Sequence, residues 1–259
     1  MNRSIPTIWI RATLLAVPVL VVQVAVTQLQ VDSGARALSA AIAQEGKKPE
    51  RETRRTPALR NAVYEKLSEA QVAAEAKDLN TAKRILDEMI ANSGSKALNS
   101  YELANVYNLY AFIQYSKEDY AGALRSYEKV VAQPDIPLAM EINTRFTIAQ
   151  LYFVQEQWQK GIDALLKWFA MTDKPNANAY ILLAQGYYQV KDYDKALVNV
   201  QKAISMSKAA DKVPKEQWYN LARFLYFEKN DVNNTVAVLE ELLKYYPKKE
   251  YWVQVSHMY

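Results

Sequence analysis

A spaced pattern of polar, apolar and small residues recurs along the chain between residues 59 and 259. Each occurrence has an acidic or amide residue, an apolar residue, two variable positions and then a small residue. Five stretches fit it: Asp78-Leu79-x-x-Ala82, Asp119-Tyr120-x-x-Ala123, Gln157-Trp158-x-x-Gly161, Asp192-Tyr193-x-x-Ala196 and, more weakly, Asp231-Val232-x-x-Thr235. The last residues of these stretches are separated by 41, 38, 35 and 39 positions. Spacing of this kind predicts a repeated structural unit.

A second set of small residues lies twelve positions before the first set. Four of the five repeats follow the rule, with Ala70, Ala111, Ala149 and Ala184, and the fifth has Arg223 instead. Two small residues at this spacing predict a helical hairpin whose helices, A and B, approach closely where the small residues face each other. The Asp or Gln of the pattern would begin helix B, because its side chain can accept a hydrogen bond from an unpaired backbone N–H.

The period is close to that of tetratricopeptide repeats (TPR), which are helix-turn-helix units of about 34 residues. The sequence therefore predicts an all-α TPR superhelix of about five units over residues 59–259. Proline residues that cannot continue a helix mark the ends of the B helices, at Pro134, Pro175, Pro214 and Pro247. The final segment matches the opening half of a sixth unit, at Trp252, Val255, Ser256 and Tyr259. We therefore expect the repeat domain to continue beyond residue 259.

The N-terminal segment has the features of an export signal. Arg3 and Arg11 precede an apolar run from Ala12 to Val26, which is shorter than the roughly 20 residues that span a bilayer. We predict a signal peptide over residues 1–43, cleaved between Ala43 and Gln44. The long stretch between the apolar run and this site keeps an uncleaved inner-membrane anchor as the alternative. Both interpretations place the body of the protein in the periplasm.

Residues 44–58 are charged, contain proline and have few apolar side chains, so they predict a linker. Composition then narrows the function classes. The chain has no cysteine, and its single histidine is His257, which removes the commonest metal ligands and general bases. We expect no catalytic residue, metal or cofactor. A net charge of +4 without a cluster of Lys and Arg argues against nucleic acid as a partner.

The inner surface of a TPR superhelix is made by its A helices. In the register above, four rows of A-helix residues face that surface. From the start of the helices to their end, the rows are Asn105, Asn143, Asn178 and Gln217; Asn108, Phe146, Ile181 and Asn220; Phe112, Gln150, Gln185 and Phe224; Tyr115, Phe153, Tyr188 and Phe227. Amides can donate to and accept from a peptide backbone, and rings supply apolar contact. The rows predict a surface for a protein or an extended peptide; the alternative is that the aromatic residues pack between adjacent helices as core.

Three blocks carry a resemblance to a known family: Pro49-Glu50-Arg51-Glu52-Thr53-Arg54-Arg55-Thr56-Pro57-Ala58-Leu59-Arg60, Leu151-Tyr152-Phe153-Val154-Gln155 and Lys249-Glu250-Tyr251-Trp252-Val253-Gln254. In these blocks the chain resembles the periplasmic TPR proteins associated with TonB–ExbB–ExbD energy-transduction systems of gammaproteobacteria. The resemblance implies a non-catalytic scaffold, accessory to TonB-dependent outer-membrane transport, with TonB-system components as partners. The alternative is the N-terminal interaction domain of a longer envelope enzyme or assembly factor.

Overall fold

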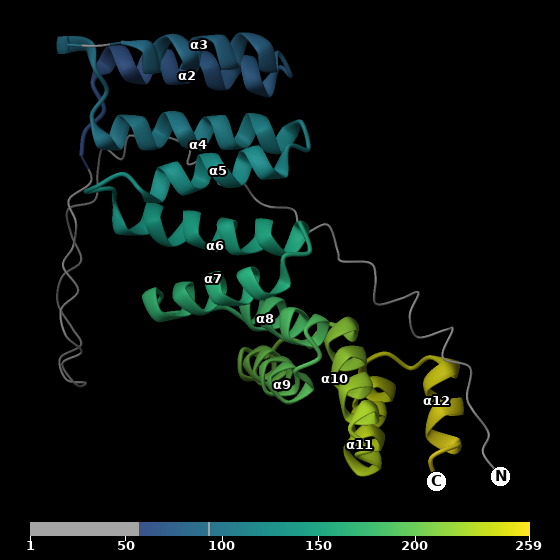
Figure 1. Cartoon of the computed structure of the whole chain (residues 1–259). Coiled ribbons are helices and arrows are strands. Elements are labelled where there is room, and N and C mark those ends of the chain that lie inside the picture. Colours follow the sequence, from purple (N-terminus) through teal and green to yellow (C-terminus); the bar gives the residue numbers. More distant parts are fainter. Residues whose placement is uncertain (1–56, 93) are drawn as a thin grey trace, which may run out of the picture. The chain divides into compact units, whose positions relative to one another are not determined.

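A computed structural model describes residues 57–92 and 94–259, and every regular element within these ranges is helical (Figure 1). The predicted signal segment, its cleavage site and nearly all of the predicted linker lie outside them. The α-helices are α2 (Asn61–Glu75), α3 (Leu79–Ala91), α4 (Ser100–Ser116), α5 (Tyr120–Val131), α6 (Leu138–Val154), α7 (Trp158–Met171), α8 (Ala177–Gln189), α9 (Tyr193–Ala209), α10 (Glu216–Glu228), α11 (Val232–Tyr245) and α12 (Lys249–Ser256). A short 3-10 helix covers Gly94–Lys96.

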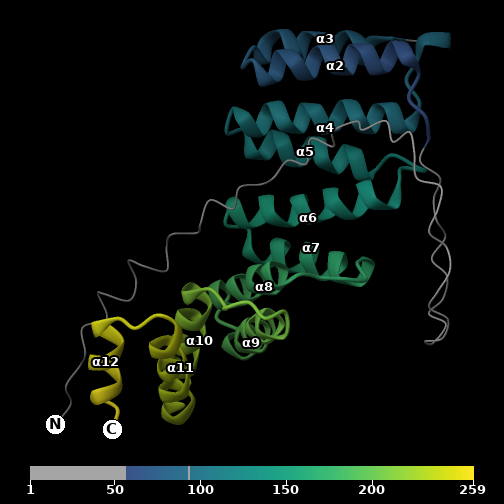
Figure 2. The ribbon, with the colours of Figure 1, turned by 180° about the vertical axis from the view of Figure 1, so that it is seen from behind.

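The helices are paired as the repeat pattern predicts. Even-numbered helices from α2 to α10 are the A helices, and each packs most closely against the B helix that follows it. Each B helix also packs against the next A helix, so the five hairpins follow one another in chain order (Figures 1 and 2). The α12 helix packs against α11. The predicted all-α TPR architecture is confirmed for the described residues.

The turn between helices A and B has the same construction in all five hairpins. The residue before the cap has a left-handed backbone, at Lys77, Glu118, Glu156, Lys191 and Asn230, with φ between 56° and 63°. In four hairpins the following aspartate accepts a hydrogen bond from the backbone N–H three positions later, as predicted: Asp78, Asp119, Asp192 and Asp231. The prediction is wrong for Gln157, whose longer side chain accepts from Lys160 Nζ at 2.9 Å instead.

The small residues of both helices are buried where the hairpins close. Seven alanines of the two rows have no exposed surface: Ala70, Ala82, Ala111, Ala123, Ala149, Ala184 and Ala196. In the fifth hairpin Thr235 is 1 % exposed, while the side chain of Arg223 extends to α12 and donates from Nη1 to Gln254 Oε1 at 2.7 Å. Burial lowers the pKa of Arg223. Arg223, the one residue that departs from the pattern of small residues, thus forms a polar contact between the fifth hairpin and α12.

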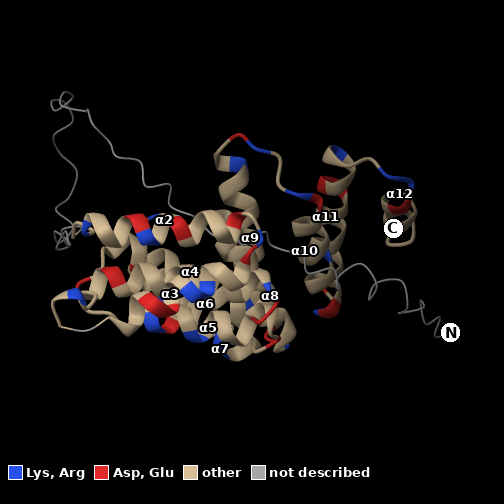
Figure 3. Cartoon of the chain, turned by 90° about the horizontal axis from the view of Figure 1, so that it is seen from above, with Lys and Arg blue, Asp and Glu red and all other residues tan. Residues whose placement is uncertain are grey.

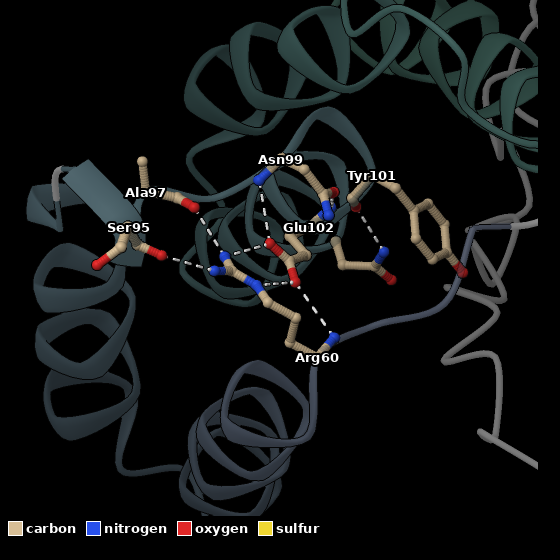
Figure 4. A network of polar contacts seen from close by, with 7 residues as sticks. Arg60, Ser95, Ala97, Asn99, Tyr101 and Glu102 are labelled. Atoms are coloured by element: carbon tan, nitrogen blue, oxygen red, sulfur yellow. Dashed lines mark hydrogen bonds and ion pairs between the residues drawn. The ribbon is translucent and has the colours of Figure 1, made fainter.

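A buried carboxylate ties the start of the first repeat to the start of the second (Figure 4). Glu102 has no exposed surface and accepts from Arg60 Nε at 2.8 Å and Arg60 Nη2 at 2.6 Å. Glu102 also forms a capping box with Asn99, its carboxylate accepting from the Asn99 N–H at 3.0 Å. The Arg60 guanidinium also donates to the carbonyls of Ser95 and Ala97. The hydrogen bond from Arg60 holds the pKa of Glu102 below its usual value.

The four loop prolines lie between helices, as predicted. In the predicted register, Tyr251 stands at the place of Val106, Thr144, Ala179 and Trp218, which are buried in the preceding A helices. The α12 helix ends at Ser256, and its buried aromatic residue is Tyr251, 3 % exposed, whereas Trp252 is 60 % exposed. The Tyr251 ring packs in the apolar cluster of Tyr219, Leu239 and Leu242, and its hydroxyl donates to Glu216 Oε1 of α10 at 2.5 Å. Within the described residues, none of the helices combines the length and apolar character needed to cross a membrane.

Candidate functional site

The row at the start of the A helices is largely open to solvent. Asn143, Asn178 and Gln217 are exposed, and no other group in the described part of the chain bonds to their side-chain amides. Asn105 differs because it is partly buried and its Nδ2 donates to the Tyr101 carbonyl of its own helix at 2.7 Å. Three of the four predicted amides therefore keep their hydrogen-bonding capacity free for a partner.

The second row is divided between partly open and packed positions. Asn108 and Phe146 are partly buried, and the Phe146 ring lies 4.7 Å from the Trp168 ring of α7. Ile181 is only 8 % exposed. Asn220 donates from Nδ2 to the Tyr251 hydroxyl at 2.9 Å, so α12 already occupies this amide. As a contact surface, the row offers Asn108 and part of Phe146.

The third row is also mixed. Phe112 packs against the apolar cluster of the first hairpin, and Gln150 is 8 % exposed. Gln185 and Phe224 are partly buried. The Phe224 ring lies 5.4 Å from that of Tyr188, edge to face, which shows that inner positions of the consecutive A helices α8 and α10 adjoin.

The aromatic row at the end of the A helices closes the turn to helix B. Three of its rings contact the aromatic residue five positions later, which directly follows the cap of helix B. The ring pairs are Tyr115–Tyr120 at 5.4 Å, Phe153–Trp158 at 6.2 Å and Tyr188–Tyr193 at 6.0 Å. The fifth repeat has Val232 at that place, and Phe227 is 46 % exposed. The row is therefore structural in three repeats and open in one.

Phe153 corrects the prediction most clearly. It is 5 % exposed, and its ring fills a space left by two glycines. A Cβ atom at Gly161 of α7 would lie 2.9 Å from Phe153 Cδ1, and one at Gly186 of α8 would lie 2.6 Å from Phe153 Cε1. Phe153, Gln150 and Ile181 are therefore packing residues, because the neighbouring helices cover them.

The sequence did not identify Gly186 as a packing position. For the aromatic row at the end of the A helices a signal was available, because an aromatic residue directly after the cap marks the A-helix rings that are covered. No group of three or more His, Cys, Asp or Glu side chains in the described residues could hold a metal ion. In the view of Figure 3, acidic and basic residues are interspersed along the helices. The residues of the four rows are uncharged, so they offer hydrogen bonding and apolar contact.

Comparison with known proteins gives relatives by structure. No protein-family model matches the chain, and no curated protein matches its sequence. Among solved structures, it is similar to MamA from Desulfovibrio magneticus RS-1, with 16% identity and a TM-score of 0.54 over 72% of this chain and 94% of that one. It is also similar to the TPR protein YrrB, with 13% identity and a TM-score of 0.55 over 74% and 90% of the two chains. It is similar to the apo form of RapI as well, with 11% identity and a TM-score of 0.57 over 74% of this chain and 56% of that one. These likenesses show the fold alone, that of a tetratricopeptide-repeat protein.

Proposed function

We propose that this protein is a non-catalytic periplasmic scaffold that binds a protein segment or extended peptide along its A helices. The observation that carries the proposal is the free amide row. Asn143, Asn178 and Gln217 lie at corresponding places of three consecutive repeats, exposed and without partners among the described residues. Amides spaced from repeat to repeat can pair with successive groups of an extended backbone. The TPR protein YrrB is described as having an unusual peptide-binding site, which supports this class of function.

The partner we propose is a component of a TonB–ExbB–ExbD system, served during TonB-dependent outer-membrane transport. The support is the resemblance carried by residues 49–60, together with the export signal predicted at the N-terminus. Export is tested separately. Mass spectrometry of the periplasmic fraction should find Gln44 as the first residue, whereas an intact N-terminus in the membrane fraction would favour the anchor.

Binding is tested with the purified periplasmic domains of TonB and ExbD. Calorimetric titration against the full chain should show binding to one of them, weakened by the double change Asn143→Ala and Asn178→Ala. The matched control is Asn233→Ala, which removes an exposed amide from α11, a B helix. If the wild type, the double variant and the control bind with equal affinity, the partner does not contact Asn143 and Asn178. No binding by the wild-type chain would contradict the TonB assignment.

A further inference from the structure

The junctions between consecutive repeats are alike on the B-helix side, except for one. The position five residues after the small residue of helix B is polar in three junctions and bonded to a tyrosine of the next A helix. The pairs are Asp87 with the Tyr110 hydroxyl, Glu128 with the Tyr152 hydroxyl at 3.1 Å, and Gln201 with the Tyr226 hydroxyl. In the third junction the position is Leu166, which offers Tyr187 neither a hydrogen-bond donor nor an acceptor.

A groove lies at this third junction. It has a cavity volume of about 410 Å³ and is lined by side chains of α7, α8 and α9, among them Leu166, Phe169, Leu183, Tyr187 and Val198. We name it the α7–α9 groove. Its volume falls in the range of ligand pockets, about 300–1,000 Å³. An apolar residue in place of a hydrogen-bonded pair distinguishes this junction from the other three.

The rim of the groove is unusually apolar for an exposed place. Leu166 is 43 % exposed and Val198 is 65 % exposed. The residues that correspond to Val198 in the neighbouring junctions are Arg125, Asp163 and Ala237. Two aliphatic side chains in contact with water beside an apolar cavity indicate a surface that a partner covers.

The polar groups of the groove determine what kind of segment fits. Lys229 pairs with Asp194, and Lys195 Nζ pairs with Asp192 at 2.7 Å, so the charged side chains of the lining already have partners. An extended peptide would bring backbone N–H and C=O groups that find few partners there, which is costly. A helix satisfies these groups internally and offers the groove side chains only. A helical segment is therefore favoured.

The charge beside the groove determines which residues of the docked helix are favoured next to its apolar side chains. Lys202 lies one helical turn beyond Val198, on the same side of α9. It does not pair with a carboxylate in the part of the chain that the structure describes. An acidic residue beside the apolar contact would complement this lysine.

We propose that the α7–α9 groove docks an amphipathic helix of a partner protein, which inserts leucine- or phenylalanine-sized side chains and carries acidic residues beside them. This is the helix-in-groove mode of recognition. The site lies between B helices, apart from the A-helix surface of the proposed function, so that either can fail without the other.

The probe is a synthetic helix-stabilised peptide with leucine at i, i+3, i+4 and i+7 and glutamate on its flanks. Its binding to the full chain is followed by fluorescence anisotropy. The protein variant is Leu166→Glu with Val198→Asp, which copies the polar residues Glu128 and Asp163 of the preceding junction and should therefore fold. The matched control is Val72→Asp, because Val72 is 63 % exposed in α2, away from the groove.

We expect the double variant to bind the peptide about ten-fold more weakly or worse, while Val72→Asp and the Asn143/Asn178 variant bind like the wild type. A serine-for-leucine peptide should not bind, and a lysine-flanked peptide should bind more weakly than the glutamate-flanked one. Equal binding by the double variant, or by either altered peptide, would overturn the proposal. So would sedimentation showing that the wild type dimerises and the double variant does not, because the occupant would then be a second copy. If circular dichroism shows a loss of helix in the double variant, Leu166→Gln, which copies Gln201, takes its place.

Discussion

The starts and the ends of the A helices carry predicted binding residues on the same side of each helix, but the surroundings of these residues differ. Near the start, Asn143 and Asn178 are exposed, and their side chains have no partner among the described residues. At the last turn, Phe153 is 5 % exposed and the Tyr188 ring lies 6.0 Å from that of Tyr193. The chain reverses direction just after the last turn and brings helix B back against it. The end of helix A is therefore crowded by its own repeat, and the start is not.

The fifth repeat shows that the residue after the cap decides the outcome. Phe227 stands at the same place as Phe153, but its counterpart across the turn is Val232, and both are about half exposed. An A-helix ring is thus core where an aromatic residue follows the cap, and surface where a smaller residue follows it. The ends of the A helices therefore contribute to stability, whereas their starts are available for contact with a partner.

The largest effect should come from removing a covered ring. Phe153→Ala should lower the free energy of unfolding by about 3–5 kcal/mol, because it leaves a cavity among α6, α7 and α8. Phe227→Ala should cost about 0.5 kcal/mol or less, since its ring is half exposed. Urea denaturation of the two variants measures both. A similar loss of stability in the two variants would show that the residue after the cap does not decide whether the A-helix ring is buried.

A polar residue at the start of an A helix can also be structural, as Glu102 is. Glu102→Gln should destabilise the protein by about 1.5–3 kcal/mol, because a charged acceptor of several hydrogen bonds is lost. The pKa of Glu102 is lowered in the folded state. The stability it contributes is thus present above the unfolded pKa, about 4.3, and is lost as pH falls through that value towards the folded pKa.

The pH dependence gives the control for this variant. The gap in stability between the wild type and Glu102→Gln should be largest near neutral pH and should shrink on acidification, as denaturation at a series of pH values can measure. A gap that stays constant below about pH 4 would indicate that the charge of Glu102 has no part in it. The amides of Asn143 and Asn178, which have no such partners, should give no comparable loss.

A smaller effect is expected at Gly186. An added methyl group there would lie 2.6 Å from Phe153 Cε1 and 2.9 Å from Ile162 Cγ1. Alanine is favoured over glycine within a helix, but overpacking should prevail, so Gly186→Ala should cost about 1–2 kcal/mol. Combining it with Phe153→Leu should cost less than the sum of the two single changes, because the smaller side chain makes room. Strict additivity in thermal unfolding would contradict the contact.

Much of the fold could be predicted because the repeat multiplies weak signals. A single pair such as Ala184 and Ala196 occurs in many helices, but the same spacing in successive units specifies a hairpin. Asp192 was recognisable as a cap because capping is local. The failure at Gln157 has a local reason as well, since its longer side chain bonds to Lys160 Nζ instead.

The candidate site was less predictable because burial depends on neighbouring helices. Gly186 read as an unremarkable helix residue, although it accommodates a ring from α6. Asn220 was predicted to lie on the inner surface in the same row as Asn108, but its amide bonds to Tyr251, which comes from α12. The burial of Phe153 could have been inferred from the aromatic residue Trp158, five positions later, because the two residues flank the same turn. Packing across three helices has no such signal in the sequence.

The smallest effect on stability, and the sharpest test of the comparison, concerns Asn143 and Asn178. Asparagine is mildly unfavourable within a helix, and neither side chain gains a bond in the described residues. Changing both to alanine should therefore leave stability the same or slightly higher. Affinity for the partner should fall by about 0.5–1.5 kcal/mol for each lost hydrogen bond. Titration and urea denaturation of the same sample separate the two quantities. If the double variant loses stability instead, the start of helix A is structural like its end. If it loses neither stability nor affinity, the partner binds elsewhere.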